Sequence, residues 1–116
     1  MAVKVEENKI TMTRGDTLRV HVGIVVDNEA YTPTGKDVVR FALKHSQLNA
    51  MQTEYAEKKP LISKVVPNST QILQLNPGDT KELGFGRYDY DVEITFADGT
   101  VSTFISDTLT LTKEVD

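Results

Sequence analysis

Three carboxylates alternate along one short stretch of the chain. Asp89, Asp91 and Glu93 are separated by single residues in YDYDVEITF. Carboxylates of this kind serve as calcium ligands or as an acid and base pair. Residues two apart in a strand lie about 6.5 to 7 Å apart, whereas calcium needs six or more oxygens that converge from loops. No ligand-loop pattern accompanies the three residues, so we expect a solvated strand face without a metal.

Other residue types that carry out chemistry are isolated. His21 and His45 lie on different segments with no His or Glu at a metal-binding spacing. No serine lies in a G-x-S-x-G motif, and there is no cysteine. Gly84 and Gly86 in LGFGRY lack the third glycine and the helix that a dinucleotide site requires. We therefore expect no catalytic residues, no metal and no cofactor, and a protein that is not an enzyme.

The tripeptide Arg14-Gly15-Asp16 is one that integrins bind when a loop displays it, but it is short enough to occur by chance. Ile10 and Met12 alternate with threonines before it, and a second alternating run follows it. Glycine adopts backbone conformations that other residues resist, and aspartate bonds to nearby backbone N–H groups. The three residues are therefore expected to form a structural turn.

Alternation of apolar and polar residues dominates the elements on either side. The run TLRVHVGIVV predicts one strand whose buried face carries Leu18, Val20, Val22, Ile24 and Val26. DVVRFALK predicts another strand, with Val39, Phe41 and Leu43 inward, and PLISKVV and TQILQL predict two shorter ones.

The last third of the chain has the clearest pattern. YDYDVEITF places Tyr88, Tyr90, Val92, Ile94 and Phe96 on one face. Asp98-Gly99 then indicates a hairpin. A two-residue turn there pairs Phe96 with Val101, Ile94 with Thr103 and Val92 with Ile105, and Leu109 and Leu111 face inward on the returning strand.

These elements predict an all-β protein, an immunoglobulin-like antiparallel β-sandwich of about seven strands, with a small barrel as the alternative. A length of 116 residues suits one domain, 1–116. Residues 45–59 are expected to form an irregular loop that holds at most a short helical turn.

The connection before the tyrosine-rich strand resembles the corner at which such sandwiches bond a tyrosine hydroxyl back to the preceding backbone. The candidates for this corner are Asp79, Gly86, Tyr88 and Tyr90. The cysteine pair and core tryptophan of antibody domains are absent, because the chain has neither residue type.

Four apolar residues fall on faces predicted to be wet: Val25, Val38, Ile62 and Phe104. Single exposed apolar residues are common, and a register error of one would turn any of them inward. The hypothesis we keep is that some of them contact another subunit.

Charge and hydropathy narrow the class of partner. The net charge is −4, with both signs interspersed, so no positive stripe suits nucleic acid. No apolar run approaches the length of a membrane span, and MAVKVEENKI lacks the apolar region of a signal peptide. We expect synthesis in a cytoplasm and no nucleic-acid or membrane partner.

The motifs in order are ITMTRGDTLRVHV, KPLISKVV, LNPGDTKELGFGRYDYDVEI, DGTVSTFI and LTLTKEV. This series resembles the immunoglobulin-like N-terminal domain of upper baseplate proteins from tailed phages and prophages of Gram-positive bacteria, over nearly the whole chain. Residues 45–59 match none of the motifs.

The resemblance implies a non-enzymatic virion component, a tail or baseplate adaptor. Its partners are then other phage tail or baseplate proteins in a symmetric assembly, and the chain could also form a homo-oligomer. It also implies that Arg14-Gly15-Asp16 is a turn between strands. The family's domain usually opens a longer protein that carries receptor-binding parts, and whether this chain is a stand-alone version stays open. The alternative is a carbohydrate- or cell-surface-binding β-sandwich module.

Overall fold

Strands make up nearly all of the regular structure. The computed structural model describes residues 3–6, 8–46 and 60–113. In chain order its strands are β1 (Val3–Glu6), β2 (Lys9–Thr13), β3 (Leu18–His21), β4 (Val25–Val26), β5 (Glu29–Ala30), β6 (Val38–His45), β7 (Ile62–Val66), β8 (Ile72–Leu75), β9 (Gly86–Thr95) and β10 (Val101–Thr112). A four-residue helix, α2 (Pro77–Thr80), lies between β8 and β9.

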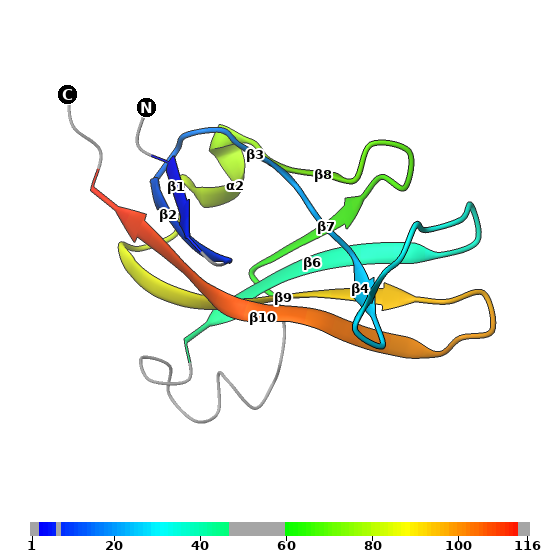
Figure 1. Ribbon diagram of the computed structural model, residues 1–116. Helices are drawn as coiled ribbons and strands as arrows, with labels where there is room; N and C mark the ends of the chain where they lie inside the picture. The colour runs from blue at the N-terminus through cyan, green and yellow to red at the C-terminus, as the bar shows by residue number, and fades with distance from the viewer. Residues whose placement is uncertain (1–2, 7, 47–59, 114–116) are drawn as a thin grey trace.

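Six of these strands form one curled sheet in the order β1-β2-β10-β9-β6-β7 (Figure 1). Two smaller ribbons, β3-β8 and β4-β5, complete the described strands. Neighbouring strands pair antiparallel with one exception, because β2 runs parallel to β10. That pairing departs from the fully antiparallel sandwich that we expected.

The core lies between the large sheet and the β3-β8 ribbon, which Figure 1 shows on one side of that sheet. From the large sheet, Phe41 and Ile94 are fully buried, and from the ribbon, Leu18 and Leu75 are fully buried. All belong to one apolar cluster. Two layers of strands that bury one face each form a sandwich-like fold, so the predicted all-β class is confirmed.

The long strands follow the sequence pattern closely. Val39, Phe41 and Leu43 of β6 are buried, while the residues between them are less so. Tyr88, Tyr90, Val92 and Ile94 of β9 alternate in the same way. Successive side chains of a strand point to opposite faces, so each of these strands presents one apolar face to the core and one polar face outward.

The predicted strand through Leu18 to Val26 is divided in two. Leu18, Val22 and Ile24 are buried as expected, but β3 ends at His21 and β4 holds only two residues. The Val22 N–H donates to the Gln71 carbonyl at 2.7 Å, and the Ile24 carbonyl accepts from the Tyr31 N–H. The burial pattern is therefore right and the prediction of one continuous strand is wrong.

The hairpin between β9 and β10 is longer than a two-residue turn. Phe96 N–H donates to the Thr100 carbonyl at 2.8 Å, and Gly99 N–H donates to the Phe96 carbonyl at 2.9 Å with a φ of 90° at Gly99. As a result Thr95 pairs with Val101, and Ile94 pairs with Ser102. A register shift between Thr103 and Ile105 then restores the predicted pairing of Val92 with Ile105.

The expected loop at 45–59 lies outside the described residues from 47 on. His45 itself is the last residue of β6, and Ser46 is buried.

Candidate functional site

The Arg14-Gly15-Asp16 stretch is a turn between β2 and β3. Gly15 has a φ of 86°, a conformation that glycine adopts without steric cost. Asp16 N–H donates to the Thr13 carbonyl at 3.1 Å. Gly15 N–H donates to the hydroxyl of Thr80, a fully buried residue of α2, at 2.8 Å. The turn is thus bonded to a segment 65 residues further along the chain.

The Arg14 side chain lies against the same connection. Its guanidinium donates to the Leu83 carbonyl at 3.1 Å and lies 4.2 Å from the centre of the Phe85 ring. A guanidinium over an aromatic face is attracted by the ring quadrupole. The arginine is therefore held by intramolecular contacts, which is the arrangement of a structural turn.

The tyrosine candidates make different bonds. The Tyr88 hydroxyl donates to the Gly84 carbonyl at 2.7 Å, across the corner that leads into β9. The Tyr90 hydroxyl donates to the Asn8 carbonyl, so it joins β9 to the loop before β2. Burial raises the pKa of Tyr90 to about 12. Tyr88 thus has the bond of a tyrosine corner, while Tyr90 stays protonated at neutral pH.

The other two corner candidates have separate roles. Asp79 accepts a hydrogen bond from the Asn76 N–H at 2.7 Å, which caps the first turn of α2, and it pairs with Lys64 of β7 at 2.9 Å. Gly86 begins β9 with a φ of 125°. Asp79 therefore holds the helical turn, and Gly86 supplies the backbone conformation at the strand entry.

Of the four apolar residues expected on wet faces, two are exposed and two pack against the core. Val25 and Val38 are exposed. Ile62 is buried, because it pairs with Leu43 on the core side of β6. Phe104 sits at the register shift of β10 and packs against the core, half-buried. The predicted outward positions of Ile62 and Phe104 are wrong. In KPLISKVV apolar residues occupy both sets of alternating positions, so the pattern does not fix which face is buried. In β10 the bulge near Phe104 changes the face to which the side chains point.

Val65 and Val101 are exposed apolar residues that the sequence reasoning did not single out. Val38 pairs with Thr95, which pairs in turn with Val101, so these three form a row across β6, β9 and β10. Val65 pairs with Arg40, one step along the same face from Val38. We call Val38, Val65 and Val101 the valine strip; they are 41%, 55% and 53% exposed. Val38 was predicted from the sequence, and counting parity from the buried Val66 could have found Val65.

Charged side chains also lie on this outer face, and where β6 and β9 run side by side their sign differs between the two strands. Arg40 and Lys44 belong to β6 and alternate with its buried residues. Asp89, Asp91 and Glu93 belong to β9. Arg40 pairs with Glu93 in the strand register, and Lys44 pairs with Asp89. Over the length that the two strands share, the outer face therefore carries cations on β6 beside carboxylates on β9, and the exposed Arg87 lies beyond this length on β9.

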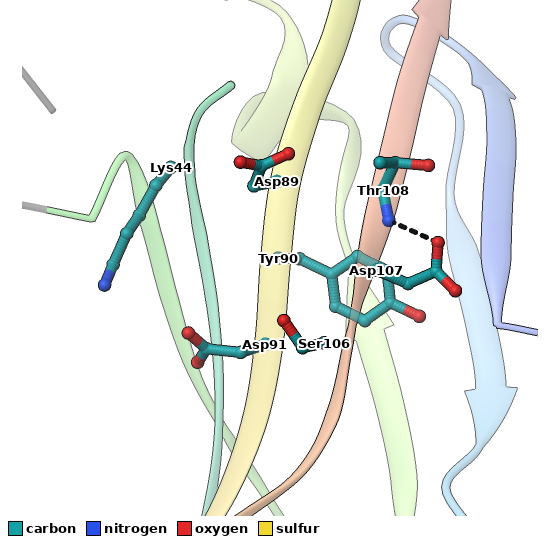
Figure 2. Close-up of a pocket in the computed structure, with 7 residues that line it drawn as sticks. All are labelled: Lys44, Asp89, Tyr90, Asp91, Ser106, Asp107 and Thr108. Carbon is teal, nitrogen blue, oxygen red and sulfur yellow. Dashed lines mark hydrogen bonds between the residues drawn. The ribbon is translucent and has the colours of Figure 1, made fainter. Parts of the chain in front are cut away.

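A shallow hollow of about 340 Å³ lies on this face, between β6, β9 and β10. Figure 2 shows Asp89 and Asp91 on β9, with Lys44 and Ser106 from the two neighbouring strands. Asp107 accepts a bond from the Thr108 N–H at 2.8 Å and lies 3.4 Å from the ammonium of Lys9. The hollow is lined mainly by polar groups, which suits water or a polar surface.

Histidines and carboxylates do not converge in the described part of the chain. Within residues 3–6, 8–46 and 60–113, no three His, Cys, Asp or Glu side chains are placed so that they could hold a metal ion. The His45 ring lies 6.0 Å from that of Tyr88, centre to centre. Over the same ranges, no helix has the length and apolar character needed to cross a bilayer.

Comparison with known proteins does not identify a family for this chain. No protein-family model matches the chain, and no curated protein matches it. A solved structure that does match is the crystal structure of CopC from Methylosinus trichosporium OB3b, with 16% identity over 71% of this chain and 74% of that chain. Its TM-score is 0.34, and a likeness of this size carries no inference about function.

Proposed function

We propose that this chain is a non-enzymatic structural protein of a phage or prophage, a tail or baseplate adaptor that acts through contacts with other proteins of the particle. Its place of action is then the virion, after synthesis in the bacterial cytoplasm. The phage assignment starts from the order of motifs along the chain.

The observation that carries the proposal is the valine strip. Val38, Val65 and Val101 leave apolar surface in water on three strands of one sheet. Grouped exposed apolar residues with polar neighbours are typical of protein contact sites. Here the neighbours are the charged residues of β6 and β9.

The contacts of the turn support the same proposal. Two of the segments that carry the phage resemblance, around Arg14-Gly15-Asp16 and around residues 76–90, are bonded to each other through Thr80, Leu83 and Phe85. A turn held in this way also leaves Arg14 engaged, which disfavours integrin binding.

The test is mass spectrometry of phage-like particles induced from the organism that encodes the chain. We expect the protein at a fixed stoichiometry with tail proteins. Its absence from intact particles, while it is expressed in the same cells, would contradict the proposal.

A pair of variants links the particle to the valine strip. Val38→Glu places a charge in the strip, and we expect it to fold but to be lost from particles, because a buried unpaired charge is costly at an interface. Ser69→Glu adds the same charge at an exposed position of the β7–β8 connection, and it should be incorporated as the wild type is. Equal incorporation of both variants would exclude the strip as the contact.

A carbohydrate-binding module is the second candidate, and the polar hollow beside Asp91 and Ser106 is the feature that favours it. Sugar sites commonly add an aromatic platform. Among the described residues, Phe85 is the large exposed aromatic, and its ring lies against Arg14. A glycan array decides: saturable binding that Asp91→Asn abolishes would favour this candidate over the adaptor.

A further inference from the structure

The charges on the outer face are arranged in a self-complementary way. Cations lie on β6 and carboxylates on the adjacent β9, at matching positions along the strands. Arg40 and Glu93 are direct cross-strand neighbours. Yet the bond that Arg40 makes is to the Ser63 hydroxyl, at 3.0 Å, and Arg40 remains exposed. A second face of the same kind could therefore satisfy both charges.

We propose that a second copy of this chain docks on the outer face, sheet against sheet, about a two-fold axis parallel to the strands and midway between β6 and β9. Such an axis lays β6 of each copy over β9 of the other. Each residue keeps its position along the strand direction, so residues that are cross-strand neighbours within one copy also face each other between the copies. Arg40 then meets Glu93 of the second copy, and Lys44 meets Asp89 of the second copy. The inference rests on the proposed function only in taking this face as a protein contact.

The other two-fold arrangement is unfavourable. An axis in the plane of the face and perpendicular to the strands lays β6 over β6, so that cations face cations. Like charges placed opposite each other at an interface repel and weaken the association. The strand-wise separation of sign on this face therefore selects one orientation.

The apolar residues fit the selected arrangement. Over the flanking strands, β7 of one copy lies across β10 of the other, which brings Val65 over Thr103 and covers the end of the face that carries Val38 and Val101. Face-to-face sheets pack about 10 Å apart, with strands aligned to within about 30°. Arginine and glutamate side chains are long enough to meet across that gap.

Sedimentation velocity of the pure protein, from about 10 µM to about 1 mM, is the experiment, since a contact confined to one face of four strands belongs with small and weak interfaces. We expect a monomer–dimer equilibrium in the wild type. Arg40→Glu and Glu93→Arg should each raise the dissociation constant more than tenfold, because each places like charges opposite each other twice in the symmetric dimer.

Mixing the two variants separates contacts between copies from contacts within one. Positions 40 and 93 are both acidic in Arg40→Glu and both basic in Glu93→Arg. Each of these positions therefore meets the opposite charge across a heterodimer, which should form at close to the wild-type concentration. A clash inside either chain could not be repaired by mixing.

A matched control and a folding check accompany these variants. Arg19→Glu is an exposed charge reversal on β3, away from the outer face, and it should dimerise as the wild type does. Circular dichroism checks that each variant is folded.

Several results would overturn the inference: a wild-type monomer at every concentration, single variants that dimerise normally, or a mixture that stays monomeric. A wild-type monomer that is nevertheless found in particles would end this inference and leave the proposed function standing. A protein that dimerises in solution but is absent from particles would support this inference and contradict the proposed function.

Discussion

Asp37 shows how a single buried carboxylate holds a bend of the chain. It accepts hydrogen bonds from the Thr34 N–H at 2.8 Å and from the Tyr31 hydroxyl at 2.7 Å. The Asn68 side-chain amide donates to the Asp37 carbonyl at 2.8 Å, from the β7–β8 connection. The Thr34 N–H and then the Tyr31 hydroxyl lower the pKa of Asp37, because both bonds favour the ionised carboxylate.

This arrangement predicts how stability changes with acid. The folded pKa of Asp37 is lower than that of the unfolded chain, so its contribution is present in full above the ordinary aspartate pKa of about 3.9 and is lost as the pH falls through the lower folded value. Asp37→Asn should be less stable at pH 7, and its stability should fall less steeply than that of the wild type between about pH 5 and pH 2. Urea midpoints at each pH measure both.

A second variant isolates the cause. Tyr31→Phe removes one of the bonds that lower the pKa of Asp37, so this pKa should rise when followed by NMR of the carboxyl carbon. An unchanged pKa in Tyr31→Phe would show that the Tyr31 bond does not lower the pKa of Asp37, and parallel acid profiles for the wild type and Asp37→Asn would show that Asp37 is not the source of the acid dependence.

At the scale of elements, the β2–β3 turn and α2 depend on each other. The Thr80 hydroxyl is the acceptor for the Gly15 N–H, and Thr80 is fully buried. Thr80→Val keeps the shape but leaves that N–H without its partner, which should cost about 1 to 3 kcal/mol of unfolding free energy. Thr80→Ser keeps the hydroxyl and should lose less. Equal losses in urea titrations of the two variants would point to the methyl group and not to the bond.

Elements were predictable where one pattern extends over many residues. β6 and β9 have eight and ten residues of alternation, enough to fix which face is buried. Over short or interrupted runs, the segments with which a strand pairs decide where the strand ends and which face is buried. The pairing of β3 with β8 stops at the Val22 N–H bond to Gln71, whose φ of 55° ends the partner strand, and Ile62 turns inward because it pairs with Leu43. Neither partner is marked in the local sequence.

The candidate surface was harder to predict, because it depends on which strands become neighbours. Sequence alternation placed Val38 outward and Asp91 on a solvated face. In the folded sheet β6 lies beside β9, with Arg40 opposite Glu93. This arrangement comes from the pairing of two segments that are about 50 residues apart in the sequence. The row of β6 cations beside β9 carboxylates is therefore a property of the assembled sheet.

At the scale of the whole molecule, the two layers share one core, so they should unfold together. Leu75 of β8 and the tyrosines of β9 belong to the same apolar cluster although they lie in different sheets. Leu75→Ala removes a fully buried side chain and should cost about 2 to 5 kcal/mol.

Two probes test that coupling. Two of the four tyrosines, Tyr88 and Tyr90, lie in β9, so tyrosine fluorescence reports on β9 in a background that carries Tyr31→Phe and Tyr55→Phe, whereas circular dichroism reports on all strands. Both should show one transition in urea, shifted by the same amount in Leu75→Ala, because a single cooperative unit gives coincident transitions. Gln74→Ala, at the exposed neighbour on β8, should change the unfolding free energy by less than about 0.5 kcal/mol. If the tyrosine transition stayed in place while the circular dichroism transition moved, the β3-β8 ribbon would unfold separately, and the chain would hold two cooperative units in place of one.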